Sequence, residues 1–174
     1  RAARAVLERA RKEIADALEW GCEIIFTSGA SEAVEIAASR ARVPGRAHGS
    51  TEHAIVPHAM GAGARVITVG ADGLIDEGDL RAALAEGPAL VAIQQVNNET
   101  GVIQPLDRIA PLVREAGSLL LADCAQSAGK IPLLDAEALL ELGERHGAVR
   151  RRAPALHDVG EIVEFGHAQL VGEG

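Results

Sequence analysis

The sequence predicts an α/β fold in which a mostly parallel sheet is covered by helices on both faces. Two observations predict it. Short apolar runs such as 89–96 and 119–122 are bounded by Gly, Pro or small polar residues, as buried strands are. Segments with apolar residues at helical spacing, about three turns long, separate these runs. Strands that alternate with crossover helices of this length form parallel sheets.

The first half of the chain contains three helical patterns and one β-prone run. Residues 2–18 carry apolar side chains at helical spacing until a Trp-Gly pair ends the pattern. Residues 23–26 form a short strand, and a small-residue loop leads into the second helix, which Ser28 or Ser31 would cap. Residues 40–50 are expected to be a connection rich in Gly, Pro and Arg, and a third helix starts soon after it.

The second half alternates strands and helices more regularly. Residues 65–69 form a strand, and acidic residues then fill the first turn of a helix over 76–85. The largely apolar strand 89–96 and the helix 105–116 follow. The apolar run 119–122 is the last predicted strand, and it ends in an Asp.

The patterning weakens after about residue 134, which divides the chain into two parts. Residues 1–134 are expected to form a partial large domain, and residues 135–174 a divergent, poorly packed tail. An amphipathic helix over 134–144 is plausible, but an Arg-rich segment and an acidic, weakly apolar stretch at 158–174 follow, with no clear strand. We expect the chain to be cut at its front and its reading to be truncated or frame-shifted after about residue 134.

Composition excludes several classes of function. A formal net charge of −8 argues against nucleic-acid binding, which depends on excess Lys and Arg. No apolar run approaches the roughly 20 residues that span a bilayer. Cys22 and Cys124 make no disulfide framework and fit a reducing compartment, so a cytoplasmic location is expected. No Cys/His cluster has the spacing of a metal site.

Polar residues follow three of the predicted strands. Ser31, Asn98 and Asp123 come where strands end, and ligands of open α/β sheets bind beyond those carboxyl ends. The helix after Ser31 could hold a phosphate on its free N–H groups, or the Ser could only cap it. Asp123 and Asn98 could likewise be simple turn formers. His53, at a helix start, is either structural or an imidazole plane for a ligand ring.

Four motifs together resemble the cysteine desulfurases, pyridoxal-phosphate enzymes of the class V aminotransferase group. The motifs are Phe-Thr-Ser-Gly-Ala-Ser-Glu-Ala at 26–33, Thr-Glu-His at 51–53, Val-Asn-Asn-Glu-Thr-Gly at 96–101 and Asp-Cys-Ala-Gln-Ser-Ala-Gly-Lys at 123–130. Their order and spacing match the family from about residue 5 to about residue 133. The resemblance implies the large-domain fold of fold-type I pyridoxal-phosphate transferases.

The resemblance also implies six cofactor-binding positions. Ala30 and Ser31 match the loop that binds the cofactor phosphate, and His53 matches the histidine that stacks on the ring and also does acid–base work. Asn98 matches the amide near the ring substituent and the substrate. Asp123 matches the partner of the protonated ring nitrogen, and Gln126 matches the donor to the ring oxygen. A buried carboxylate raises the pKa of that nitrogen and so keeps the ring an electron sink.

A complete member would take sulfur from L-cysteine as an enzyme persulfide, release alanine and hand the sulfur to an acceptor protein, as in iron–sulfur cluster assembly. It would typically be a homodimer. The family's Schiff-base Lys has no match here, since the two lysines are Lys12 and Lys130 and residues 144–152 hold none. Its nucleophilic Cys and substrate-binding Arg belong to a region further along. This chain alone is therefore expected to be inactive and to bind pyridoxal phosphate weakly and reversibly at most.

Two alternatives stay open. The chain could belong to another class V member, such as a selenocysteine lyase or a small-amino-acid aminotransferase, because the fold and the cofactor-binding residues would be the same. It could also be a non-catalytic remnant that serves as a binding or dimerisation scaffold.

Overall fold

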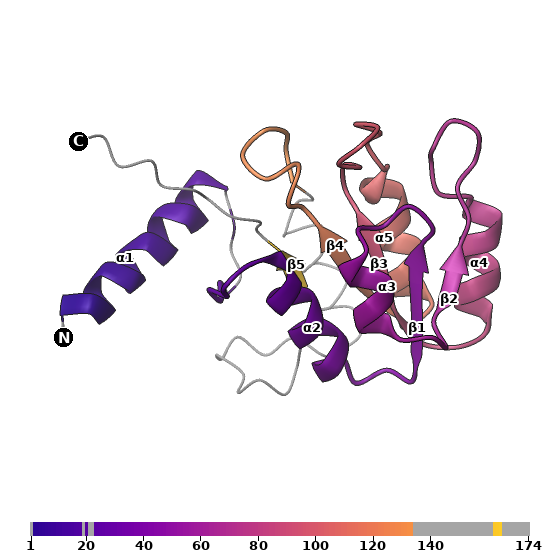
Figure 1. The fold of residues 1–174 in the computed structure, drawn as a ribbon, viewed down its shortest axis with the longest axis horizontal. Coiled ribbons are helices and arrows are strands. Elements are labelled where there is room, and N and C mark those ends of the chain that lie inside the picture. The colour runs from indigo at the N-terminus through magenta and orange to yellow at the C-terminus, as the bar shows by residue number, and fades with distance from the viewer. Residues whose placement is uncertain (1, 19, 21–22, 134–161, 165–174) are drawn as a thin grey trace.

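A parallel sheet forms the centre of the molecule (Figure 1). The computed structural model describes residues 2–18, 20, 23–133 and 162–164. Within these residues the sheet has five strands in the order β2-β1-β3-β4-β5, all paired in parallel. The strands are β1 (Gly45–Gly49), β2 (Arg65–Ile67), β3 (Ala89–Gln94), β4 (Leu119–Asp123) and β5 (Ile162–Glu164).

Helices cover both faces of the sheet, as the alternating pattern predicts. On one face α2 (Ala30–Arg40) and α3 (Ile55–Met60) pack against Leu90 and Ala92 of β3. On the other face α4 (Glu77–Ala85) and α5 (Leu106–Glu115) pack against Val91 and Ile93. Every residue of β3 is buried because both of its faces are covered. The α/β fold class is thus confirmed.

The first helix lies apart from this core. α1 (Ala2–Ala17) contains no buried residue, and Figure 1 shows it extending away from the sheet. Its last turns instead pack on a small separate cluster built around Trp20 and Ile24. Among the described residues no helix is both long enough and apolar enough to cross a membrane.

The prediction that residues 40–50 form only a connection is wrong, because they contain β1. This strand lies between β2 and β3. Its sequence, Gly-Arg-Ala-His-Gly, holds no β-branched residue, so local preference does not favour a strand there. Pairing on both sides overrides that preference. Gly45 is required for this packing, since a Cβ at that position would lie 2.8 Å from the Cβ of Ala89.

The predicted strand at 23–26 is also absent from the structure. Ile25 and Phe26 are exposed rather than inserted into the sheet. The segment is held to α1 instead: Arg11 donates from Nε to the Ile24 carbonyl oxygen at 2.7 Å, and its guanidinium lies over the Phe26 ring at 5.3 Å. None of the described strands lies beside residues 23–26 to pair with them, so this apolar run forms no strand.

The tail contributes one strand that its pattern does not reveal. β5 pairs with β4, with Ala122 opposite Val163 in register. The expectation of no clear strand over 158–174 is therefore wrong. A strand of three residues gains its stability from the edge it extends, which a local sequence pattern does not show. The helix expected over 134–144 lies outside the described residues.

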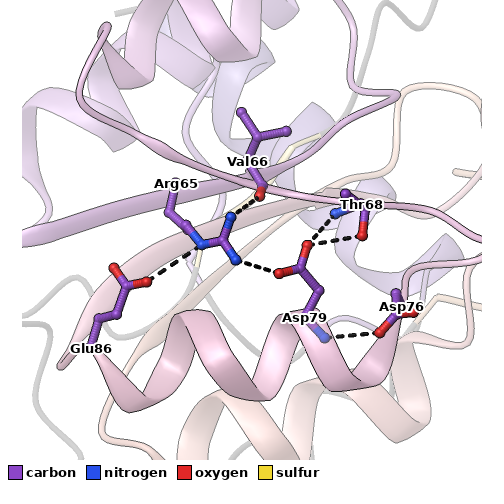
Figure 2. Close-up of polar contacts among 6 residues, drawn as sticks. All are labelled: Arg65, Val66, Thr68, Asp76, Asp79 and Glu86. Carbon is purple, nitrogen blue, oxygen red and sulfur yellow. Dashed lines mark hydrogen bonds and ion pairs between the residues drawn. The ribbon is translucent and has the colours of Figure 1, made fainter.

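One ion-pair cluster fixes α4 to the edge strand β2 (Figure 2). The Asp79 carboxylate accepts from the backbone N and the Oγ1 of Thr68, at 2.8 and 2.9 Å, and pairs with the Arg65 guanidinium. These contacts, the Thr68 backbone N–H foremost, hold the pKa of Asp79 below its ordinary value. Asp76 caps the helix by accepting from the Asp79 N–H at 2.8 Å, so the predicted acidic helix start is confirmed.

Candidate functional site

The loops that carry most of the predicted site residues meet at one edge of the sheet. In Figure 1 the loops after β1, β3 and β4 all leave the sheet at its upper edge. These three strands are adjacent and parallel, so their carboxyl ends lie side by side. His53 follows β1, Asn98 follows β3, and Asp123 is the last residue of β4. The sequence predicted this position for Asn98 and Asp123. Ser31, the third residue of that prediction, follows no strand because residues 23–26 form none, and His53 was predicted only as the start of a helix.

Asp123 performs one of the two roles that its position suggests, that of a turn cap. It is half-buried, and its Oδ1 accepts from the backbone N of Ala125 at 2.9 Å, so it does cap the turn. Its other oxygen accepts no hydrogen bond from any residue that the structure describes. The described part of the chain thus leaves this carboxylate oxygen, at the end of a central strand, without a donor. Ligands of open α/β sheets bind at such strand ends.

The remaining polar candidates are presented to solvent. The side chains of Ser31, His53, Asn98 and Gln126 are all exposed. Among the described residues, the backbone N of Ile55 makes only a long contact with the His53 ring, 3.4 Å from Nδ1. These groups are therefore available to a ligand rather than committed to the fold. Within the described ranges, no three His, Cys, Asp or Glu residues are placed to hold a metal ion.

The start of α2 differs from the prediction that a serine caps it. Gly29 is the N-cap residue, with no side-chain cap. Glu32 instead reaches back and accepts from the Ser28 backbone N at 2.6 Å, and this bond lowers the pKa of the Glu32 carboxyl. The N–H groups of Ala30 and Ser31 lie in the first turn, where no carbonyl of the helix can accept them. They are the donors that remain for an anion.

Sequence reasoning missed one acid at the same edge. The two oxygens of the Glu52 carboxyl lie 3.1 and 2.9 Å from the backbone N of Gln94, the last residue of β3, and accept its N–H. Burial raises the pKa of Glu52 to about 8, with the charge of Asp123 adding to the rise and the Gln94 bond opposing it. The sequence places Glu52 between a segment that ends in Gly and His53, and this was the one sign of its role. Its partner, Gln94, lies 42 positions further along the chain, so the contact itself could not be predicted.

Comparison with known proteins decides the family. Residues 1–138 match the family model described as aminotransferase class-V. The chain belongs to this family. It is 39% identical over 149 residues to the cysteine desulfurase IscS of Anaeromyxobacter sp. (strain Fw109-5), covering 78% of this chain and 37% of the relative. It is also 39% identical over 140 residues to the mitochondrial cysteine desulfurase of Candida albicans, covering 73% of this chain and 29% of that protein.

Solved structures of this family have the same fold. The chain resembles a NifS-like protein from Rickettsia africae with a TM-score of 0.69 and 27% identity, covering 75% of this chain and 39% of that one. An alanine–glyoxylate aminotransferase from Nostoc sp. gives a TM-score of 0.63 and 27% identity, covering 74% and 37% of the two chains. The resemblance to cysteine desulfurases is thus confirmed, and the chain spans less than two fifths of the length of these relatives.

Proposed function

We propose that residues 1–134 are part of the pyridoxal-phosphate-binding large domain of a cysteine desulfurase. The single observation that carries the proposal is the convergence of His53, Asn98 and Asp123 at the ends of three adjacent parallel strands. Each presents a group that the cofactor can use: an aromatic ring, an amide and a carboxylate oxygen that takes no described donor.

The residues present fit this cofactor. The N–H groups of Ala30 and Ser31 would hold its phosphate, and the His53 ring would lie on its pyridine face. The Asp123 oxygen that takes no donor among the described residues would accept from the protonated ring nitrogen and keep the proton there. Gln126 would donate to the ring oxygen, and Asn98 to the substituent beside it. When bound, the cofactor supplies an electron sink for bonds to the substrate's α-carbon.

Covalent attachment of the cofactor is not part of the proposal for this chain. Of the two lysines, Lys12 lies on α1 and pairs with Asp16 at 2.5 Å. Lys130 is exposed beyond the turn after β4. We therefore propose weak, reversible binding through the ring and phosphate alone, and no turnover by this chain alone.

The activity of the whole protein is proposed from its relatives, which are named cysteine desulfurases. It would take sulfur from L-cysteine, release alanine and pass the sulfur to an acceptor protein, including for iron–sulfur cluster assembly. A homodimer in the cytoplasm is proposed on the same basis. The similarity to the Nostoc aminotransferase supports a second candidate, amino-group transfer on the same cofactor platform.

A titration with two probes tests the binding proposal. Pyridoxal phosphate reports binding by visible absorbance. Pyridoxine 5′-phosphate cannot condense with amines, because an alcohol replaces its aldehyde, so it reports recognition of ring and phosphate alone. Both probes should saturate the chain with dissociation constants that agree within about threefold. Asp123→Asn should weaken both about tenfold or more, since a charge-assisted hydrogen bond is worth about 1.5–3 kcal/mol.

The matched control is Asp107→Asn, which removes one carboxylate from the exposed first turn of α5. It should leave both affinities unchanged. Equal loss of binding in the two variants would show a general charge effect instead of a specific ring contact. No saturable binding of either probe by the unmodified chain, or a borohydride-reducible adduct on Lys130, would overturn the proposal.

A further inference from the structure

A cluster of buried polar side chains lies beneath the loop that presents His53. The backbone carbonyl of Thr51 accepts two amide donors from β3 and its following loop: Gln94 Nε2 at 2.5 Å and Asn97 Nδ2 at 3.1 Å. Both amide side chains are buried, with Gln94 3% exposed and Asn97 9% exposed. Two donors on one carbonyl place the chain just before His53 in a fixed position.

The other end of the Asn97 amide holds a second loop. Its Oδ1 accepts from the backbone N of Glu99 at 3.0 Å, from the backbone N of Thr100 at 2.8 Å and from the Thr100 Oγ1 at 3.0 Å. The Asn97 backbone also closes this turn, because its carbonyl accepts from the Gly101 N–H at 3.0 Å. The turn 97–101 contains Asn98, so the Asn97 oxygen orders the segment that presents Asn98.

We propose that Asn97 is a positioning residue that joins the turn presenting His53 to the turn presenting Asn98 through the two ends of its one amide group. The inference rests on the proposed function, in which His53 and Asn98 contact the cofactor. Asn97 itself is buried and touches Thr51, Glu99 and Thr100. Its effect on ligand binding is therefore transmitted through its neighbour in sequence, Asn98, and through the loop that ends in His53.

The chemistry explains why an amide serves at this position. Three donors converge on Oδ1, so the oxygen end must be an acceptor, while the other end must donate to a carbonyl. Asn carries one acceptor and one donor end on a short, planar group. An Asp keeps the acceptor end but sets a second acceptor against the Thr51 carbonyl. The substitution Asn97→Asp thus breaks the link to the His53 loop and leaves the turn around Asn98 capped.

The test compares Asn97→Asp with Thr100→Val, which removes only one of the three donors to Oδ1. Pyridoxine 5′-phosphate affinity, urea stability and ¹H–¹³C NMR of the His53 ring in the ligand-free chain are measured for each. We expect Asn97→Asp to shift the His53 ring signals and to weaken the probe about tenfold. Asn97→Asp should lower the probe affinity much less when His53→Ala is already present, because the effects of substitutions at coupled residues are not additive. Thr100→Val should change affinity less than about threefold and leave the His53 signals in place.

The outcomes separate this inference from the proposed function. Unshifted His53 signals together with unchanged affinity in Asn97→Asp would overturn the inference even when the unmodified chain binds the probe. Lower urea stability with unchanged affinity would also overturn it, since Asn97 would then be structural only. If the unmodified chain binds no probe, the proposed function fails, and the ligand-free NMR shifts still decide whether Asn97 positions the His53 loop. Asn97→Ser, which keeps a smaller donor and acceptor, serves if Asn97→Asp does not fold.

Discussion

Replacing Glu52 with Gln should remove a large part of the pH dependence of stability. The folded chain holds the proton of Glu52 up to a pKa of about 8, whereas an unfolded chain releases it near the ordinary value of 4.5. Between these values the unfolded state binds fewer protons, so the free energy of unfolding falls as pH rises. Each pH unit costs about 1.4 kcal/mol, and the total loss by pH 8 is on the order of 4 kcal/mol.

The Gln amide reproduces the protonated carboxyl, since its oxygen can still accept the Gln94 N–H that Glu52 accepts at 2.9 and 3.1 Å. Glu52→Gln should match the unmodified chain near pH 4.5 and become increasingly more stable than it toward pH 8. Urea unfolding followed by circular dichroism at pH 5, 6, 7 and 8 measures the difference in free energy of unfolding between the two chains. The titration of the histidines contributes equally to both chains and cancels in this difference. Glu35→Gln, an exposed change on α2, is the control and should run parallel to the unmodified chain. Parallel curves for Glu52→Gln would refute the reasoning.

Three further predictions concern the fold. Asp79→Asn should lower the melting temperature more at pH 7 than at pH 3. The folded-state pKa of Asp79 lies below its ordinary value of 3.8, so its stabilising contribution is complete above 3.8 and declines as pH falls through the folded-state pKa. An equal loss at both pH values would contradict this. Gln104→Ala should lower the free energy of unfolding, measured in urea, by about 1–3 kcal/mol. The Ile75 N–H donates to the Gln104 side chain at 2.9 Å and would lose this buried acceptor; Asp107→Asn is the neutral control. Ile93→Ala should lower the free energy of unfolding by about 2–5 kcal/mol in the same assay. A loss below about 1 kcal/mol would show that β3 is not fully covered by helices.

The strands that the sequence predicts are those whose own residues require burial. β3 and β4 are short apolar runs bounded by Gly, Pro or polar residues, and their pattern alone locates them. β1 could not be predicted in this way, because its stability comes from pairing with β2 and β3 and from the close approach that Gly45 allows. The same reason applies in reverse to residues 23–26, whose apolar side chains form no strand among the described residues.

The site divides along a similar line. Asn98 and Asp123 could be predicted from their positions after strands, and His53 only from its motif, because the strand before it was missed. Three adjacent strands bring these residues to one edge. Glu52 and Asn97 could not be assigned their contacts, because their partners lie 42 and 46 positions away along the chain. Such pairings depend on the register of β1 against β3, which a single sequence does not contain.

An NMR titration tests the central claim most directly. ¹H–¹⁵N spectra of the chain are recorded as pyridoxine 5′-phosphate is added. The proposed cofactor contacts predict that the largest shifts fall on the amides of Ser31, His53, Asn98, Asp123 and Gln126, and that all follow one dissociation constant. Shifts confined to β2 and α4 at the far side of the sheet, or no saturable shifts, would contradict the claim that this edge is a cofactor site.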